Sequence, residues 1–470
     1  MKKEILISRG VKMIISVILA AGEGTRMKSN IPKVAHNVCG SPMVSHVIDA
    51  AKGAGCEKNI VIVGHGKEKI KEILDGENIV FANQPIGKDK PYGTGYAVMQ
   101  AEKHISDDDK VIILTGDTPL IEADTLKELV GYSEKYDLDA VVLTAKFEDA
   151  TGYGRIKRKE NGNIIGIVEH KDATEMEREI KEINSGIFMF KGNALKYALK
   201  SLTNENSQNE YYITDAIKIL SDDGYNVDGY ILKDNMEILG VNSKVQLSEA
   251  EEFMRRKINN YHMLNGVTLI DPKTTYIEKT VEIGRDSIIY PGTVLKGKTK
   301  IGCDCIIEGS TSITDTTIHD RINIKSSTLI ESVVDDDTKI GPNAYLRPKS
   351  NIGKNVKIGD FVEVKNANIG NNSKASHLSY IGDADVGENV NIGCGVVFVN
   401  YDGKNKFRST VGDNAFIGSN SNLVAPVIVR DHGYIAAGST ITDEVREGDL
   451  SIARARQVNK PNWVFNKKNK

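Results

Sequence analysis

The sequence has few of the features that mark secreted or membrane proteins. Its 470 residues include five cysteines and one tryptophan. The cysteines are odd in number and scattered along the chain, so we expect no disulfide framework, and a reducing compartment fits better. No segment approaches the roughly 18 apolar residues that a membrane-spanning helix needs. We therefore expect a cytoplasmic protein with no membrane partner.

The chain also lacks an excess of charge of either sign. Lysine and arginine number 61 against 64 acidic residues, for a net charge of −3. This balance gives no reason to expect a nucleic-acid partner, although a local basic pocket remains compatible with it. Apolar residues make up 40% and charged residues 27%, which is typical of a folded, soluble protein. The length favours two domains.

The N-terminus has one feature of a signal peptide, an apolar run over residues 13–21. Arg9 and Lys12 precede this run and break any longer one. The run also leads directly into Gly22-Glu23-Gly24-Thr25-Arg26, a loop with chemical potential. We interpret the run as a buried first strand and residues 1–12 as an additional N-terminal tail.

Short β-branched runs alternate with amphipathic stretches through residues 13–241. Strands are predicted at residues 14–19, 60–63, 79–81, 111–114 and 140–143, and helices at 44–51, 97–105 and 123–136. This alternation predicts a mostly parallel, Rossmann-like α/β sheet covered on both faces. Apolar residues at three- and four-residue steps then predict a helical connector over 242–266, capped by Asn242 or Ser243.

From residue 267 to 470 the apolar period becomes six. Aliphatic residues hold this spacing over residues 277–313, 340–364 and 417–441, often followed by glycine. This is the hexapeptide pattern of a parallel β-helix, with one aliphatic side chain per short strand filling the core. The register breaks near Ile318 and Ile369, and a polar insertion interrupts it at 400–406. Cys303 and Cys305 would point the same way and pack, rather than bind a metal.

A glycine-rich basic loop follows the first predicted strand. Gly22 and Gly24 would let backbone N–H groups approach phosphates, and Arg26 and Lys33 would add charge. The loop matches neither the dinucleotide fingerprint nor the P-loop, so a simple tight turn is the alternative. Asp117 stands at the carboxyl end of a predicted strand, where ligands of parallel sheets bind. It could hold Mg²⁺, or could merely cap a helix or turn.

The repeat half carries a second group of polar residues. Arg347 and Lys365 are eighteen residues apart, so they should stack on successive coils about 4.8 Å apart. Two stacked cations suggest a phosphate or carboxylate ligand, and a solvated face is the alternative. His377 is the best candidate for a general base, although a lone histidine on a solenoid is more often an ordinary surface or core residue.

Together these motifs resemble a known family. Leu-Ala-Ala-Gly-x-Gly-Thr-Arg-Met at 19–27, with Pro-Lys at 32–33, is similar to sugar nucleotidyltransferases. With the hexapeptide half, the chain from Ile14 to Trp463 resembles the bifunctional UDP-N-acetylglucosamine pyrophosphorylase and glucosamine-1-phosphate N-acetyltransferase family. The resemblance implies a left-handed β-helix, a homotrimer and Mg²⁺. It also implies two reactions, acetyl transfer from acetyl-CoA to glucosamine-1-phosphate and uridylyl transfer from UTP to N-acetylglucosamine-1-phosphate.

The same resemblance implies roles for residues of the N-terminal half. Arg26 and Lys33 would neutralise the triphosphate as catalytic residues, and Asp117 and Asn242 would hold Mg²⁺. The residues expected to bind UTP or UDP-N-acetylglucosamine are Leu19, Ala20, Ala21, Gly22, Lys33, Gln84, Gly93, Thr94, Gly154, Glu169, Asn184 and Asn242. Without the resemblance, Glu169 and Asn184 would count as ordinary surface and turn residues. Eight residues separate Gln84 from Gly93, a longer connection than is usual in the family.

In the C-terminal half, the resemblance implies that His377 deprotonates the amine of glucosamine-1-phosphate, with Glu363 orienting it. Arg347, Lys365, Tyr380 and Asn391 would bind that substrate. Acetyl-CoA would contact Asn400, Tyr401, Lys406, Ser419, Ala437 and Arg454. Two alternatives stay open: a single-activity nucleotidyltransferase with a structural β-helix, and a non-enzymatic binding scaffold. His377 and the 400–406 loop disfavour the first alternative, and the basic loop with Asp117 disfavours the second.

Overall fold

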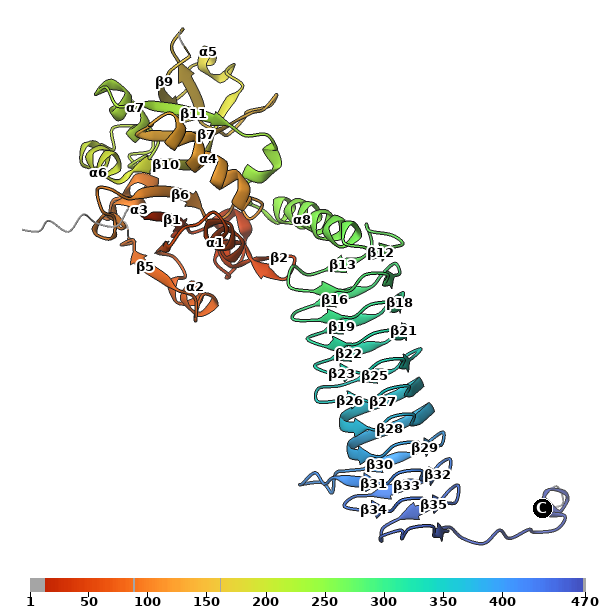
Figure 1. The fold of residues 1–470 in the computed structure, drawn as a ribbon. Helices are drawn as coiled ribbons and strands as arrows, with labels where there is room; N and C mark the ends of the chain where they lie inside the picture. The colour runs from red at the N-terminus through yellow and green to blue at the C-terminus, as the bar shows by residue number, and fades with distance from the viewer. Residues whose placement is uncertain (1–12, 88, 161, 468–470) are drawn as a thin grey trace, which may run out of the picture. The chain divides into compact units, whose positions relative to one another are not determined.

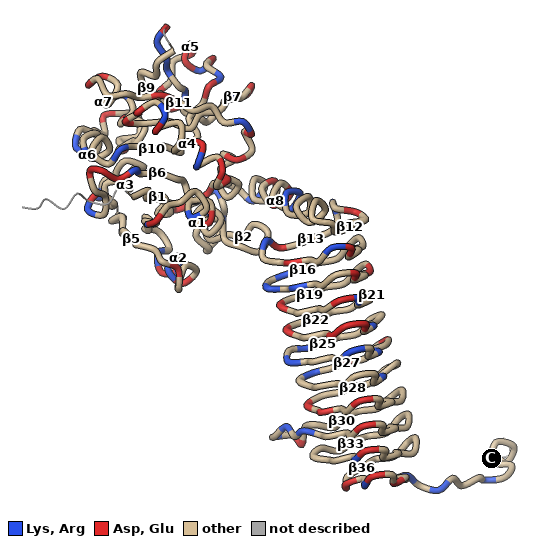
Figure 2. The backbone as a smooth tube through the Cα atoms, viewed as in Figure 1, with Lys and Arg blue, Asp and Glu red and all other residues tan. Residues whose placement is uncertain are grey.

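The computed structural model describes residues 13–87, 89–160 and 162–467, so the predicted tail at 1–12 lies outside the described residues. The chain divides into two compact units, Met1–Met254 and Arg255–Lys470, which Figure 1 shows as an α/β unit and a stack of short strands. Positive and negative residues are interspersed in both units (Figure 2). Among the described helices, none has the length and apolar character needed to cross a membrane.

The first unit is built on one twisted sheet. In spatial order its strands are β11 (Val227–Ile231), β7 (Ala140–Lys146), β10 (Glu182–Lys191), β6 (Lys110–Thr115), β1 (Ile14–Ala20), β4 (Lys58–Val63) and β5 (Ile79–Asn83). In addition, β8 (Arg155–Arg158) pairs with β10, and β9 (Ile164–Val168) pairs with β8. Only β10, β8 and β9 run antiparallel to their neighbours. The prediction of a mostly parallel sheet is therefore confirmed. A small hairpin, β2 (Asn37–Val38) with β3 (Ser41–Pro42), stands apart from it.

Helices cover both faces of this sheet. They are α1 (Met43–Gly53), α2 (Lys67–Ile73), α3 (Thr94–Met99), α4 (Ala123–Lys135), α5 (Glu175–Arg178), α6 (Gly192–Ser201) and α7 (Asp215–Asp222), with 3-10 turns η1 (Thr25–Met27), η2 (Lys33–Ala35), η3 (Glu102–His104) and η4 (Asn235–Ile238). In β1, Ile18 packs with α1 and α4, whereas Val17 packs with α3, α6 and α7. Alternate residues of a strand face opposite sides, so this split places a core on each face.

One predicted helix, 97–105, is wrong in extent. The chain forms α3 and then η3, with a turn between them, instead of one continuous helix. Val98, Ala101 and Ile105 are all buried in the same core, so the turn keeps these apolar residues on one side. The apolar spacing therefore identified the buried residues correctly, but the backbone buries them with two short helical elements instead of one helix.

The connector is a single helix, α8 (Lys244–Leu264). Ser243, rather than Asn242, provides the cap, because its hydroxyl accepts a hydrogen bond from Gln246 N at 3.2 Å. The Asn242 side chain is thereby left available for other contacts. The division between the two units falls within this helix, between Met254 and Arg255.

The second unit is a parallel β-helix with three faces. Face 1 contains β12 (Thr268–Leu269), β15 (Ile288–Ile289), β18 (Ile306–Glu308), β21 (Asn323–Lys325), β24 (Lys339–Ile340), β29 (Asn391–Ile392), β32 (Phe416–Ile417), β35 (Tyr434–Ile435) and β37 (Leu450–Ser451). Face 2 contains β13 (Tyr276–Ile277), β16 (Val294–Lys296), β19 (Ser312–Thr314), β22 (Thr328–Ile330), β25 (Tyr345–Leu346), β30 (Val397–Val399), β33 (Asn422–Val424) and β36 (Thr440–Ile441). Face 3 contains β14 (Glu282–Ile283), β17 (Lys300–Ile301), β20 (Thr317–Ile318), β23 (Val333–Val334), β26 (Asn351–Ile352), β31 (Ser409–Val411) and β34 (Ile428–Val429). The long strands β27 (Lys357–Ile369) and β28 (Lys374–Val386) pass through all three faces, and α9 (Trp463–Lys467) follows the last coil.

The pairing explains the breaks in the six-residue pattern. The first coils repeat after eighteen residues, as where Ile277 pairs with Leu295. The coils that end at Ile318 and Ile369 repeat after seventeen, because these residues pair with Ile301 and Ile352. The 400–406 insertion lengthens a later coil, so that Ala384 pairs with Ser409.

The two cysteines of the repeat half do not point the same way, so that expectation is wrong. Cys305 is fully buried in the β-helix core, whereas Cys303 is half-exposed and lies outside the core. Asp304, between them, has a left-handed φ of 58°, which turns the chain at a corner. Packing is therefore the role of Cys305 alone.

Candidate active sites

The basic loop after β1 is a tight structure whose two ends touch. Gly24 has a φ of 68°, and a Cβ atom built on it would lie 2.6 Å from Cβ of Lys33. A glycine is thus needed here both for the backbone and for the approach of Lys33. Gly22 differs, because a Cβ atom there would meet nothing within 4 Å. Open space therefore lies beside Gly22, where a ligand could approach the backbone.

Four residues that are distant in sequence converge beside this loop. Nζ of Lys33 pairs with the carboxylate of Asp117 and donates to Oδ1 of Asn242 at 3.0 Å. Arg26 Nη2 donates to the same amide oxygen at 2.8 Å. The backbone supports this arrangement, since Val241 N donates to Asp117 O at 2.9 Å.

The donor set of this cluster fits a divalent metal ion. Asp117 offers a carboxylate oxygen and Asn242 an amide oxygen, which are the hard ligands that Mg²⁺ takes, usually together with substrate phosphates. In this structure both oxygens already contact a cation, the ammonium of Lys33. The Lys33 and Asp117 side chains are only 18% and 16% exposed, so their attraction is less screened than a surface pair.

Gly24→Ala is expected to damage this site. The left-handed backbone would cost about 1–2 kcal/mol, and the new methyl group would displace Lys33. A misplacement of about 1 Å can cost roughly 10²-fold in rate, so we expect the uridylyl transfer that the resemblance implies, measured by pyrophosphate release, to fall by about that factor. Gly76→Ala is the matched control, because Gly76 has a φ of 81° but nothing within 4 Å of its Cβ position. Equal loss of activity in both variants would contradict the role of the Lys33 contact.

The residues expected to read the nucleobase lie at the same sheet edge. A Cβ atom on Gly64, after β4, would be 3.0 Å from Ala21 and 3.3 Å from Ile86, so the segment after Gln84 lies beside the first loop. Gln84 is buried, and its N–H donates to Val63 O at 2.9 Å. Gly93 cannot carry a side chain, because a Cβ atom would lie 2.4 Å from Tyr211 O.

Thr94 has a local structural contact as well as its predicted role. Its hydroxyl accepts a hydrogen bond from Ile213 N at 3.0 Å, which holds the start of α3 against the segment before α7. The long connection between Gln84 and Gly93 is exposed wherever the structure describes it. The extra residues therefore extend outward and leave both ends of the connection at the sheet edge.

The three residues expected to bind the sugar also come together. Asn184 N donates to Gly154 O at 2.9 Å, and a Cβ atom on Gly154 would lie 3.4 Å from the Glu169 carboxylate. Burial raises the pKa of Glu169, although Thr214 donates a hydrogen bond to it at 3.2 Å. Perturbed carboxylates often gather at functional sites, which makes this cluster a candidate for the predicted sugar contact.

Tyr153 is a further residue of this region that sequence reasoning missed. Burial raises its pKa, and the negative charge of Asp117 adds to the effect. Tyr153 therefore lies near Asp117 while its neighbour Gly154 belongs to the sugar cluster. In the sequence, Tyr153 is marked only by its position between Gly152 and Gly154, and only Gly154 was predicted to bind the sugar.

In the β-helix, the partner of His377 is Asp360 and not the predicted Glu363. Nδ1 of His377 lies 2.7 Å from Oδ1 of Asp360, whereas Glu363 pairs with Nη1 of Arg347 at 2.8 Å. The reason is the register, since Asp360 pairs with His377 on successive coils and Glu363 pairs with Tyr380. The hydrogen bond from His377 holds the pKa of Asp360 below its usual range, so this carboxylate is ionised at neutral pH. An Nδ1–H that donates to Asp360 leaves Nε2 free to accept a proton.

Asp360→Asn is expected to slow the acetyl transfer that the resemblance implies by about 10²-fold or more, because a carboxamide can stabilise the wrong imidazole tautomer. The release of free CoA thiol measures this rate. Asp335→Asn is the matched control, since Asp335 faces another histidine, His319, on the same β-helix. Unchanged acetyl transfer in Asp360→Asn would show that the pair has no part in the reaction.

Face 2 carries the predicted pair of stacked cations. Leu346 and Val364 pair on successive coils, so the residues that follow them, Arg347 and Lys365, stack as predicted. Lys406, from the inserted loop, joins them, and the proximity of Lys365 lowers the pKa of Lys406. Asn400 donates to the hydroxyl of Tyr380 at 3.3 Å. Three cations and a phenol thus surround one patch of surface.

Asp383 is a buried carboxylate at this patch that was not predicted. It lies 3.6 Å from Lys365 Nζ and accepts hydrogen bonds from Asn366 and Asn400. It therefore fixes the inserted loop to the cation pair. The spacing of Asn366, Asp383 and Asn400, seventeen residues apart, is the signal that could have identified it.

Three of the predicted acetyl-CoA residues, Ser419, Ala437 and Arg454, follow one corner of the β-helix. Leu378 O accepts from Gly395 N at 2.7 Å, Cys394 O from Asn420 N at 2.7 Å and Ser419 O from Gly438 N at 2.8 Å. Arg454 then reaches back to Ala437 O at 2.9 Å. The corner that begins beside His377 thus continues past Ser419 and Ala437 to Arg454.

Two predicted residues do not share this surface. Asn391 pairs with Lys374 and Phe416 on face 1, whereas Tyr380 lies on face 2. Tyr401 is exposed, and its hydroxyl donates to Gly403 O within its own loop at 2.6 Å. Among the described residues, neither side chain forms a hydrogen bond with a residue of the cation patch, although the backbone of Tyr401 pairs with Lys406.

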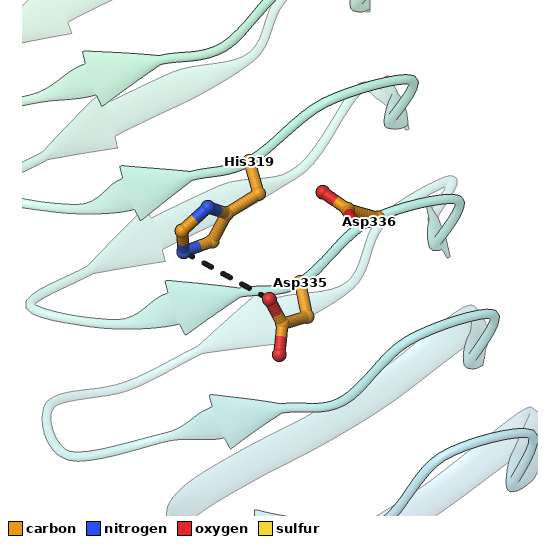
Figure 3. A group of neighbouring side chains, drawn as sticks. All are labelled: His319, Asp335 and Asp336. Carbon is orange, nitrogen blue, oxygen red and sulfur yellow. Dashed lines mark ion pairs between the residues drawn. The ribbon is translucent and has the colours of Figure 1, made fainter.

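A third polar group lies on earlier coils of the β-helix (Figure 3). His319, Asp335 and Asp336 have side-chain ligand atoms within 4.8 Å of one another. Asp336, however, pairs with Lys354 at 3.2 Å and with Arg321 at 3.6 Å. Because these cations already neutralise it, the group is better described as a ladder of charges than as a metal site.

Comparison with known proteins identifies relatives of both halves of the chain. Residues 15–249 match the nucleotidyl transferase family, and residues 331–366 match the bacterial transferase hexapeptide family with its six repeats. The chain is 57% identical over 455 residues to the bifunctional protein GlmU of Clostridioides difficile strain 630, covering 97% of this chain and 98% of that protein. The GlmU of Alkaliphilus oremlandii strain OhILAs is 55% identical over 454 residues, covering 96% and 98%. The chain belongs to the bifunctional GlmU family.

It follows that both halves are enzymes acting on small molecules. The protein is a uridylyltransferase and an acetyltransferase of UDP-N-acetylglucosamine synthesis, and as a GlmU-type nucleotidyltransferase it uses a divalent metal ion. The alternative of a purely structural β-helix is thereby excluded. So is the alternative of a non-enzymatic scaffold.

Proposed function

We propose that uridylyl transfer takes place at the sheet edge beside the basic loop. The convergence of Asp117 and Asn242 on the Lys33 ammonium supports this most directly. A phosphate oxygen of N-acetylglucosamine-1-phosphate attacks the α-phosphorus of UTP, and the bond to pyrophosphate breaks. Arg26 and Lys33 neutralise the charge of the triphosphate, and charge neutralisation and positioning are what phosphoryl transfer needs.

We assign each of the other predicted residues of this unit to one of the two substrates, the nucleotide or the sugar phosphate. Leu19, Ala20, Ala21, Gly22, Gln84, Gly93 and Thr94 hold the nucleotide, and Gly154, Glu169 and Asn184 hold the sugar. We assign the metal ion as Mg²⁺ on Asp117 and Asn242, where it would neutralise the phosphates. The oxygen donors of these two side chains support this choice.

We propose that acetyl transfer takes place on face 2 of the β-helix and its corner. Arg347, Lys365 and Tyr380 bind the phosphate end of glucosamine-1-phosphate, and Nε2 of His377 accepts a proton from its amine. We reassign Lys406 from its expected contact with acetyl-CoA to this phosphate, because it lies beside Lys365. The amine nitrogen attacks the carbonyl carbon of acetyl-CoA, the C–S bond breaks, and the sulfur leaves as the CoA thiolate. Asn400, Tyr401, Ser419, Ala437 and Arg454 line the path of acetyl-CoA.

We propose that the working form is a cytoplasmic homotrimer. Face 1 exposes Phe416, Tyr434 and Leu450, and the first two rings stack at 4.5 Å. Such an apolar column on a soluble protein is a typical contact surface. Asn391 lies next to Phe416 on this face, so a neighbouring subunit would bring its substrate close to Asn391. We assign the domains as 13–241, the arm 242–266, and 267–470.

Two assays on purified protein test these assignments. One measures pyrophosphate released from UTP with N-acetylglucosamine-1-phosphate, and the other measures CoA thiol released with glucosamine-1-phosphate. Separate sites require that substitutions in one site leave the other assay unchanged. Sedimentation analysis of wild type and Phe416→Asp tests the trimer, which the charged variant should weaken.

A further inference from the structure

Glu237 in η4 is a buried carboxylate to which the proposed mechanism gives no role. It is 6% exposed, and both of its oxygens are used. Oε2 accepts the backbone N–H of Glu122 at 2.9 Å, and Oε1 accepts the hydroxyl of Thr125 at 2.9 Å. In the described part of the chain, no lysine or arginine forms an ion pair with it.

A carboxylate is costly in this position. Burial raises the pKa of Glu237 to about 7, and the charges of Asp234 and Glu128 add to the effect. Thr125 opposes it by donating a hydrogen bond. An apolar residue would fill the space at a lower cost in folding free energy. A carboxylate here is therefore best explained by the two groups that donate hydrogen bonds to it.

The two segments that Glu237 joins are the segments that carry the proposed metal ligands. Its partners, Glu122 and Thr125, belong to the turn and first helical residues that follow Asp117. Five residues after Glu237 stands Asn242. A third hydrogen bond joins the same two segments, from Val241 N to Asp117 O at 2.9 Å. Glu237 and Val241 thus fix the spacing of the two segments at two points.

We propose that Glu237 is a positioning residue for uridylyl transfer, which sets the distance between Asp117 and Asn242 by joining the segments that carry them. The proposal rests on the assignment of those two residues as metal ligands. Groups behind the ligands of a metal site commonly contribute about 10–100-fold to metal affinity. Removal of Glu237 should therefore weaken the metal site without touching the substrates.

The chain offers a closely matched control in Glu128. It lies on α4, one turn from Thr125, and it also joins this helix to the segment before η4, by an ion pair with Lys233 at 2.8 Å and a hydrogen bond from Tyr230 at 2.6 Å. Its side chain is 46% exposed, and these contacts do not reach the Asp117 turn. Glu128→Gln therefore makes the same chemical change between the same elements, farther from the ligands.

The experiment uses the full-length chain with Mn²⁺ as the probe. Binding of Mn²⁺ in the presence of UTP is followed by the EPR signal of the free ion, in wild type, Glu237→Ala, Glu237→Gln and Glu128→Gln. We expect Glu237→Ala to weaken Mn²⁺ binding by about 10–100-fold. Glu237→Gln should lie in between, because its amide oxygen keeps one of the two acceptors. Glu128→Gln and the acetyl-transfer rate of every variant should match wild type.

Unchanged Mn²⁺ binding in Glu237→Ala, with a lowered Tm, would overturn the proposal and leave Glu237 a purely structural role. If Glu237→Ala fails to fold, Glu237→Gln provides the test instead. Wild-type Mn²⁺ binding by Glu237→Gln would then also contradict the proposal. Asp117→Asn in the same titration separates this outcome from a failure of the metal assignment. If Asp117→Asn binds Mn²⁺ normally, the ligand assignment itself is wrong, whatever Glu237 does.

Discussion

His377→Ala is expected to lower the rate of acetyl transfer by about 10²–10⁴-fold, the usual contribution of a positioned general base. The reason lies in the hydrogen bond at 2.7 Å from Nδ1 to Asp360, which leaves Nε2 to take the proton of the amine. Release of CoA thiol with glucosamine-1-phosphate measures the effect. Uridylyl transfer should keep its wild-type rate, since that site is built from residues of the other unit.

The control for this prediction is His319→Ala. His319 faces Asp335 at 3.8 Å on an earlier coil, so it is a second exposed histidine beside an aspartate (Figure 3). It lies away from the cation patch and should be dispensable for both reactions. Comparable loss in both histidine variants would point to damage of the β-helix instead of removal of a base. A His377→Ala enzyme with normal acetyl transfer would exclude His377 from catalysis.

The fold was predictable because the spacing of apolar residues is regular in both halves of the sequence. A six-residue repeat of aliphatic residues permits little besides a β-helix, and the aliphatic residues of 277–313 are indeed its core. The stacking of Arg347 over Lys365 followed from the same count. The partner of His377 did not, because this coil has seventeen residues and therefore pairs His377 with Asp360, whereas Glu363 pairs with Tyr380.

Two of the residues that were missed share a physical character. Glu237 and Asp383 are buried carboxylates held by hydrogen bonds from segments that are distant in sequence or on other coils. No local pattern marks such a residue, since its role is defined by what folds around it. Glycines and strand ends, in contrast, carry a local backbone signal. This difference explains why Gly24 and Asp117 were found and Glu237 was not.

Asp117→Asn is expected to reduce uridylyl transfer by about 10²–10³-fold, the usual cost of losing one electrostatic contact to the reacting phosphates. The amide keeps the size of the side chain but not its charge, so Lys33 loses its anionic partner and the metal ion loses its carboxylate. The measurement is pyrophosphate release at increasing Mg²⁺, where a raised requirement for the ion accompanies the lower rate.

Asp124→Asn provides the control, because Asp124 is an exposed carboxylate seven residues later that pairs with Lys127 at 2.9 Å. It removes the same charge from the same part of the first unit without touching Lys33. Acetyl transfer should be unaffected by either substitution. If Asp117→Asn and Asp124→Asn lowered uridylyl transfer equally, the general charge of this region, and not a metal ligand at the strand end, would govern the reaction. A difference confined to Asp117 and to uridylyl transfer is what two separate phosphate-binding sites on one chain require.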